Sequence, residues 1–154
     1  MSIDDRKNVD KVRALLDPKN VAIVGASDRP GAWARNVFRT LDRHKYAGTI
    51  YPVNPRNDSV WDRKCYPSLA ALPEKPDHVC VLVPGAAAIE AIKEAGKAGA
   101  RSATVFSSGF GEGGDEEGRK LGAALSAAIR EAGLAVSGPN CMGNLAGQIG
   151  RAHV

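Results

Sequence analysis

Residues 20–33 read NVAIVGASDRPGAW, and this pattern joins a short buried strand to a helix through a loop that contains glycine. The apolar run at 21–24 is typical of a strand covered on both faces. The loop is similar to the G-x-G-x-x-G motif, in which main-chain N–H groups at a helix N-terminus hold a phosphate. Ser27 replaces the middle glycine, and Gly31 follows one residue late. The loop can therefore hold an anion, or it can be an ordinary strand-to-helix turn.

The rest of the chain continues to alternate between strand and helix patterns. Because two parallel strands need a crossover connection, this alternation predicts a parallel sheet with helices on both faces. The fold class that we expect is α/β, a doubly wound parallel sheet of Rossmann-like form in a single domain. The predicted strands are 21–24, 49–53, 78–83, 103–106 and 134–137, and the predicted helices are 10–16, 31–46, 68–72, 86–98 and 116–132.

Length and composition describe an ordinary globular protein. The 154 residues are 44% hydrophobic and 25% charged, with no apolar run long enough for a membrane span. The polar N-terminus does not look like a signal peptide, so we expect a cytoplasmic protein with no membrane partner. The net charge of +4 suits an anionic small molecule, and the scattered Lys and Arg argue against nucleic acid. The three cysteines show no C-x-x-C spacing, so we expect neither a disulfide framework nor a metal site.

We divide the chain into an N-terminal helix at 1–17, a ligand-binding domain at 18–148 and a tail at 149–154. The tail reads IGRAHV, which can be encoded by DNA that matches the start of a widely used sequencing adapter. We therefore expect the natural reading frame to differ after Gln148, and we exclude His153 from the candidate site. A natural C-terminus is the alternative.

The loop after the second strand argues against a nicotinamide cofactor. Enzymes that bind NAD usually carry Asp or Glu there, to hold the ribose hydroxyls. This chain has Val53-Asn-Pro-Arg56 instead. Arg56 could form forked hydrogen bonds to a phosphate on the ribose. A simple type I turn explains Asn-Pro equally well.

Three further loops follow strands and carry residues suited to a ligand site. Val83-Pro84 makes a rigid apolar corner, and Phe106-Ser-Ser108 places two hydroxyls at the next strand end. The string at 138–143, GPNCMG, holds an amide and a thiol between glycines. We interpret Cys65 and Cys80 as buried structural residues. For Cys141, a structural role and a functional role are both open.

Six short strings of the chain, taken together, resemble one family. They are VAIVGAS, YPVNP, CYPSLAALP, VLVP, SSGFGE and SGPNCMG, and the likeness runs from about Leu16 to Gly147. The family is the CoA-binding domain of NDP-forming acyl-CoA synthetases. It includes ADP-forming acetyl-CoA synthetase and the succinyl-CoA synthetase alpha subunit.

The resemblance implies that the ligand is coenzyme A. The first loop would hold the phosphates, the corner at Val83–Pro84 would lie beside the adenine, and the last loop would reach toward the thiol. The succinyl-type enzymes have a lysine after the second strand, where this chain has Arg56-Asn57, which leaves the exact phosphate contact there open. The residues implied are Gly25, Ala26, Ser27, Asp28, Arg29, Pro30, Val53, Asn54, Pro55, Arg56, Val83, Pro84, Phe106, Ser107, Ser108, Asn140 and Cys141.

The family's reaction interconverts an acid, CoA and a nucleotide with an acyl-CoA, through a phosphohistidine on a following domain. Neither His44, late in a helix, nor His78, at the start of a strand, matches that histidine. We therefore expect a CoA-binding part of an acid–thiol ligase that is catalytically incomplete, with further domains or a beta subunit as partners. The alternatives are a stand-alone, non-enzymatic CoA-binding protein and an NAD(P)-dependent oxidoreductase domain.

Overall fold

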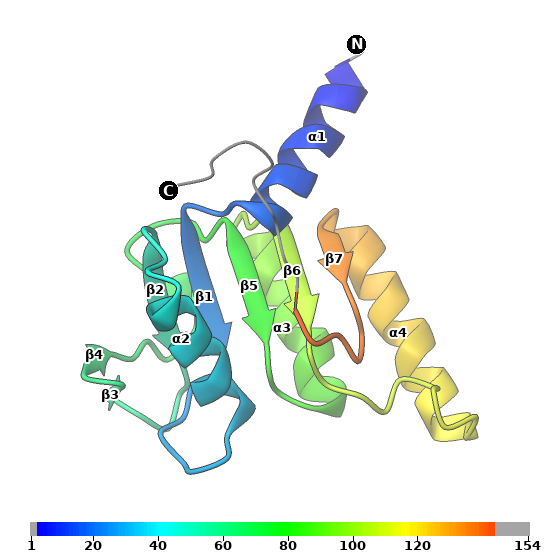
Figure 1. Cartoon of the computed structure of the whole chain (residues 1–154). Helices are drawn as coiled ribbons and strands as arrows, with labels where there is room; N and C mark the ends of the chain where they lie inside the picture. The colour runs from blue at the N-terminus through cyan, green and yellow to red at the C-terminus, as the bar shows by residue number, and fades with distance from the viewer. Residues whose placement is uncertain (1–2, 144–154) are drawn as a thin grey trace, which may run out of the picture.

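The core of the protein is a sheet of five parallel strands in the order β2-β1-β5-β6-β7. A computed structural model describes residues 3–143 of the chain, and Figure 1 shows the sheet at its centre. Strand order reverses beside β1, because β2 lies on one side of it and β5 on the other. The strands are β1 (Asn20–Val24), β2 (Thr49–Val53), β5 (His78–Val81), β6 (Ser102–Val105) and β7 (Ala135–Ser137).

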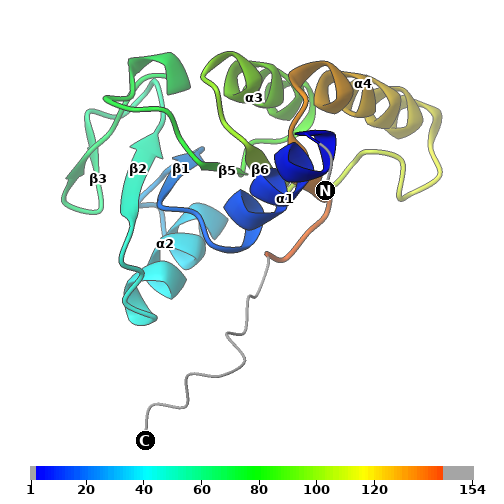
Figure 2. The same cartoon turned by 90° about the horizontal axis from the view of Figure 1, so that it is seen from above.

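Helices cover both faces of this sheet, as Figure 2 shows from above. One face carries α3 (Gly85–Lys97) and α4 (Glu116–Ala132). The other carries α2 (Trp33–Arg43) and the end of α1 (Ile3–Leu16), which contacts β6 and β7. The predicted doubly wound α/β sheet is confirmed.

Side chains alternate between the two faces along each central strand. Ala22 and Val79 pack into the cluster beneath α3 and α4, whereas Ile23 and Cys80 pack into the smaller cluster beneath α2. These four residues are 6% exposed or less, which explains why their strands read as continuous apolar runs. The cluster beneath α3 and α4 is the larger of the two. Fewer buried apolar side chains therefore cover the α2 side of the sheet.

A small antiparallel hairpin, β3 (Ser59–Val60) and β4 (Arg63–Lys64), was not predicted from the sequence. Its turn residues, Trp61 and Asp62, both have positive φ angles, of 58° and 57°. Such a turn normally carries Gly or Asn, so no signal marks it in the sequence. The Trp61 ring stacks on Phe38 of α2, with centroids 4.5 Å apart. This contact holds the hairpin against the helix.

Element boundaries differ from the prediction at several ends. The first helix begins at Ile3 rather than Asp10, and β5 ends at Val81, before the corner at Val83–Pro84. The short helix predicted at 68–72 is a 3-10 turn, η1 (Leu69–Ala71). Within residues 3–143 no helix has the length and apolar character to cross a membrane. The tail at 149–154 lies outside the described residues.

Candidate ligand-binding site

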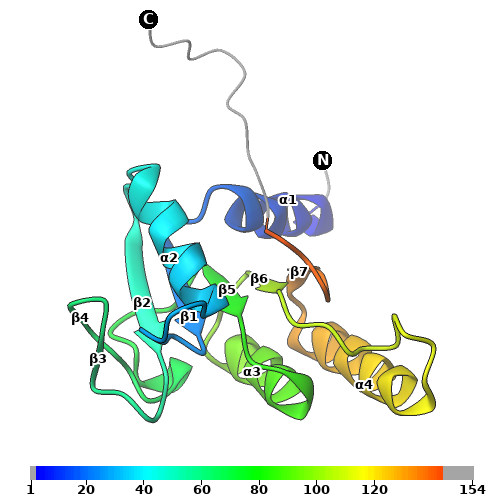
Figure 3. The ribbon, with the colours of Figure 1, turned by 60° about the horizontal axis from the view of Figure 1, so that its bottom comes forward.

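The predicted site residues lie at the carboxyl edge of the sheet, where Val53 ends β2 and the others stand in loops. The arrowheads in Figure 1 point to this edge, and Figure 3 turns it toward the viewer. Because the strands are parallel, the loops that follow β1, β2, β5, β6 and β7 all emerge there. In sheets of this kind ligands bind at the carboxyl ends of the strands, beside the reversal of strand order.

The first two loops are joined by the side chain of Asn54. Its Nδ2 donates to the carbonyl oxygen of Ala26 at 2.8 Å, and its Oδ1 accepts from the main-chain N–H of Arg56 at 3.0 Å. The N–H groups of Gly25 and Ala26 both donate to the carbonyl of Val53. Ala26 is fully buried. The loop after β1 and the loop after β2 therefore form one connected unit.

Gly25 brings that unit against the loop after β5. Its φ is +90°, a conformation that favours glycine. A Cβ at this position would stand 3.0 Å from Cγ1 of Val83 and 3.2 Å from the carbonyl oxygen of Leu82. A larger residue would push the two loops apart. The first glycine of the motif thus serves close approach as well as the turn.

The loop after β7 folds back onto the end of β6, as its orange trace in Figure 1 shows. The N–H of Asn140 donates to the carbonyl of Ser107 at 2.9 Å, and the N–H of Cys141 donates to the carbonyl of Val105 at 3.2 Å. Gly138 has φ +106°, and a Cβ there would overlap the carbonyl oxygen of Val105. The glycine permits this contact between backbones.

A cavity of about 340 Å³, called here the loop cavity, opens between the loops after β5, β6 and β7. Three of its lining residues, Trp33, Leu82 and Met142, were not predicted. Trp33 is 55% exposed and Met142 is 80% exposed, and exposed large apolar side chains that gather beside a loop are typical of a binding surface. The predicted residues that the cavity brings together are Pro84, Phe106, Ser107, Ser108, Asn140 and Cys141.

Cys141 and Ser107 each place a polar atom in this region. The Cys141 thiol lies 3.2 Å from Oγ of Ser137 and accepts from the N–H of Gly143 at 3.4 Å. The hydroxyl of Ser107 is buried and has no hydrogen-bond partner in the described part of the chain. Buried polar atoms are normally paired. A ligand in the loop cavity could supply the missing partner.

Arg29 and Arg56 are exposed and lie in the two loops that Asn54 joins. Neither forms an ion pair with another described residue, and neither lines the loop cavity. The Ser27 hydroxyl accepts from the N–H of Arg29 at 3.2 Å, and the Asp28 carboxylate accepts from the N–H of Trp61 at 3.3 Å. Asp28 thus stabilises the hairpin, a contact that sequence spacing does not reveal.

The remaining titratable candidates are accounted for by packing. Cys80 is buried, which raises its pKa to about 12, and burial also raises the pKa of Cys65. The structural interpretation of these two cysteines is therefore supported. His44 is the exposed C-cap of α2. His78 is buried at the amino end of β5, away from the loop cavity.

His78 takes part in a hydrogen-bond chain on the α2 side of the sheet. The Ser102 hydroxyl lies 3.3 Å from the carbonyl oxygen of Asp77 and hydrogen-bonds to Nδ1 of His78 at 2.9 Å. Nε2 of His78 hydrogen-bonds to the Thr104 hydroxyl at 3.1 Å. Burial lowers the pKa of His78 to about 4. The ring is therefore neutral at pH 7.

A comparison with protein families gives a match across this architecture. The model of the CoA binding domain matches residues 19–146, which includes all five loops. The chain belongs to this CoA-binding domain family. Acetate–CoA ligase [ADP-forming] II of Archaeoglobus fulgidus is 34% identical over 147 residues, which are 93% of this chain and 22% of the ligase. The domain spans only 19–22% of the length of the first curated relatives it matches.

Solved structures agree with this assignment. The dinucleotide-forming acetyl-coenzyme A synthetase 1 of Ca. Korarchaeum cryptofilum, in its apo form, superposes with a TM-score of 0.80 at 34% identity. The match covers 87% of this chain and 29% of that protein. A hypothetical protein from Pyrococcus horikoshii superposes with a TM-score of 0.64 at 30% identity, and the match covers 92% of this chain and 87% of that one. The domain therefore has similar structures both within a long synthetase and in a protein of about its own length.

Proposed function

We propose that the domain binds coenzyme A across its five loops and forms part of an NDP-forming acyl-CoA synthetase, an acid–thiol ligase. One observation carries the proposal: the loops that resemble the family's CoA-binding loops are physically connected at one edge of the sheet. Asn54 joins the first two loops, Gly25 packs against Val83, and the main-chain N–H of Cys141 hydrogen-bonds to the end of β6.

Charge explains why several loops would have to act together. CoA carries roughly four negative charges, on two bridging phosphates and one monoester. A helix N-terminus contributes only about 0.3–1 kcal/mol to anion binding, and a charged hydrogen bond contributes about 1.5–3 kcal/mol. A dissociation constant of about 10 μM requires about −7 kcal/mol, net of association costs. The first loop by itself falls short of this value.

Each loop has a distinct proposed role. The main chain at 25–30 would hold the bridging phosphates before the start of α2. The guanidinium groups of Arg29 and Arg56, which form no ion pair within residues 3–143, would hold the 3′-phosphate. The corner at Val83–Pro84 would pack against the adenine. The loop cavity, with Asn140 and Cys141, would hold the thiol end of the pantetheine arm. The phosphohistidine and the nucleotide site would lie on further domains or a beta subunit.

A second candidate is a stand-alone CoA-binding protein without enzymatic activity. It is favoured by the similarity to a solved protein of about the same length. Both candidates place CoA at the same loops, and they differ in whether a synthetase domain follows. The reading frame at the source locus decides between them: a continuous frame into such a domain supports the ligase, and a stop codon near position 154 supports the stand-alone protein.

Calorimetric titration of the 154-residue chain tests CoA binding directly. We expect CoA to bind, dephospho-CoA to bind about 10-fold more weakly, and NAD and NADP to bind little, because each phosphate contact contributes a charged hydrogen bond. Arg29→Gln and Arg56→Gln should each weaken CoA binding and reduce the difference in affinity between CoA and dephospho-CoA.

The matched control is Arg130→Gln, which removes an exposed arginine on α4 outside the five loops. It should leave CoA affinity unchanged. If CoA fails to bind, or if NADP binds more tightly than CoA, the proposed function is wrong. If CoA and dephospho-CoA bind equally, only the role of the two arginines is wrong.

A further inference from the structure

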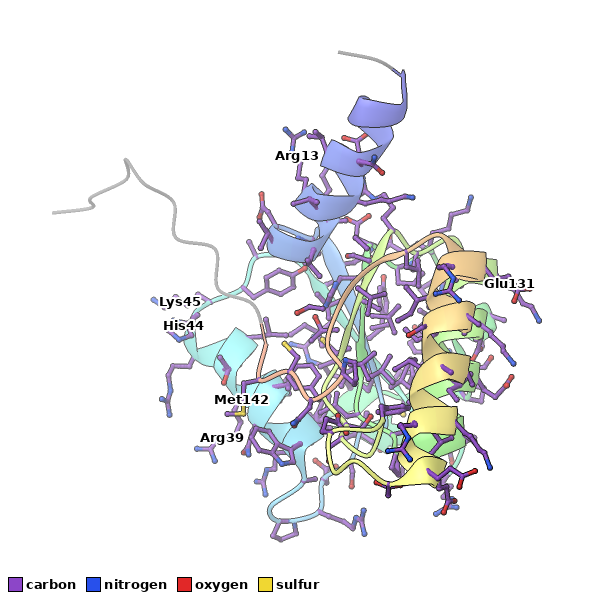
Figure 4. All side chains as sticks on the ribbon, turned by 90° about the vertical axis from the view of Figure 1, so that its right-hand side faces the viewer. Arg13, Arg39, His44, Lys45, Glu131 and Met142 are labelled. Atoms are coloured by element: carbon purple, nitrogen blue, oxygen red, sulfur yellow. The ribbon has the colours of Figure 1, made fainter. Side chains whose placement is uncertain are left out.

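A second cavity, of about 470 Å³, lies on the α2 side of the sheet and adjoins the loop cavity. We call it the sheet-face cavity. It runs from the end of α1 across β5 toward the loop after β7. Trp33, Phe106 and Met142 line both cavities, so the two spaces meet at these three side chains. Figure 4 shows Met142 beside α2, on the side of the sheet away from α4.

The walls of the sheet-face cavity are largely apolar. Val37 and Leu41 contribute from α2, and Val21 contributes from β1. No Lys or Arg is among its described lining residues. Its one described carboxylate, Asp17, lies where α1 leads into β1. The cavity therefore offers no cation to a bound anionic group.

The polar groups on its floor carry no charge. His78 and Thr104 line the cavity, and they hydrogen-bond to each other at 3.1 Å. Burial lowers the pKa of His78 to about 4, so the ring is neutral at pH 7. A neutral, internally bonded floor needs no polar partner from a ligand. An apolar group can cover it without leaving a charge unsolvated.

From this geometry we propose that the sheet-face cavity accepts an uncharged, bulky acyl group of an acyl-CoA. The inference rests on the proposed function, which places the CoA thiol in the loop cavity. An acyl group on that sulfur would pass Trp33 and Phe106 and enter the sheet-face cavity. Two aromatic walls at the passage suit an aromatic ring, because offset or edge-on ring contacts add to the burial of apolar area.

The same arrangement disfavours an acyl group that ends in a carboxylate. Moving a carboxylate from water into a largely apolar space costs free energy unless a cation or several donors receive it. The described lining provides no such cation, and its donors Asn36 and Thr40 lie on the exposed part of α2. The domain therefore discriminates between acyl groups by charge as well as by size.

Calorimetric titration of the full chain with four probes tests this inference. The probes are CoA, acetyl-CoA, benzoyl-CoA and succinyl-CoA. We expect benzoyl-CoA to bind about 10-fold more tightly than CoA, and succinyl-CoA no more tightly than acetyl-CoA, because only the benzoyl ring gains apolar contacts without burying a charge.

The variant Asn36→Trp fills the cavity from an exposed position one turn after Trp33 on α2. It should bind CoA normally and lose the extra affinity for benzoyl-CoA. The matched control Arg43→Trp changes the same helix at a residue outside the lining of the cavity, and it should behave like the unchanged chain.

The outcomes separate this inference from the proposed function. If CoA binds but benzoyl-CoA binds no more tightly, or if Asn36→Trp keeps the benzoyl increment, the acyl site is wrong and CoA binding stands. If succinyl-CoA binds as tightly as benzoyl-CoA, the discrimination by charge is wrong. If CoA itself does not bind, both proposals are wrong.

Discussion

The substitution Asn54→Ala tests whether the bond between the first two loops organises the CoA site. The side chain makes two hydrogen bonds, one to the carbonyl of Ala26 at 2.8 Å and one from the N–H of Arg56 at 3.0 Å. Losing the bond from the N–H of Arg56 costs about 1 kcal/mol, and leaving the buried Ala26 carbonyl without its donor costs about 1–3 kcal/mol. Ala26 is fully buried, so the carbonyl is poorly placed to find water. We expect the free energy of unfolding to fall by about 2–4 kcal/mol.

The same substitution should weaken CoA binding by about 10-fold at a temperature where the variant is folded, because the loops must be re-ordered when the ligand binds. Urea unfolding measures the first effect, and calorimetric titration measures the second. Asn57→Ala is the control, since Nδ2 of Asn57 reaches the same carbonyl at 3.5 Å, near the limit of a hydrogen bond. It should change both quantities much less.

One result would refute the reasoning. If Asn54→Ala lowers the free energy of unfolding as expected but binds CoA within about two-fold of the unchanged chain, the loop connection stabilises the fold without organising the site. Such a result would leave the cavity between the later loops as the main determinant of CoA affinity.

His78, Cys141 and Gly138 give three further tests of the structure. Burial lowers the pKa of His78 from 6.5 to about 4, so as pH falls the unfolded chain protonates this residue before the folded chain does. We expect the free energy of unfolding to drop by up to roughly 3 kcal/mol between pH 6.5 and 4. The variant His78→Gln should flatten that slope in urea titrations. Cys141 should react with a thiol reagent in the native state, and CoA should slow this reaction, whereas Cys65 and Cys80, at 4% and 6% exposure, should react only on unfolding; equal rates for all three by mass spectrometry would contradict the assignment. Gly138→Ala should destabilise the loop after β7, because its Cβ would overlap the Val105 carbonyl, and should lower the thermal midpoint far more than Gly114→Ala, where nothing lies within 4 Å; similar midpoints would contradict the close approach.

Several elements could be read from local patterns. The alternation of strand and helix patterns along the chain predicted a parallel sheet, and the apolar run at 21–24 predicted a strand covered on both faces. The helix Glu116–Ala132 has the predicted bounds, and β2 does as well. These features depend on residues that are close in sequence, whose polarity and backbone preferences act over a few residues.

Other features could not be predicted in this way. The hairpin at 59–64 has a Trp-Asp turn with positive φ angles, which local backbone preference disfavours. Contacts of Trp61 with Phe38 and Asp28 accompany this turn. Trp33 and Met142 enter the lining of the loop cavity only because the loop after β7 folds back beside α2. The bond from Asn54 to Ala26 joins residues 28 positions apart. No periodicity carries such information.

The order of residues along the chain thus determined that this protein would be a parallel α/β domain with its glycine loops at one edge of the sheet. Which loops touch, which side chains line the two cavities and how deeply His78 is buried were decided only by the tertiary structure. The physical reason is that strand and helix periodicity is a property of neighbouring residues, whereas a binding site depends on contacts between distant segments. Those contacts form once the core has fixed the strand order.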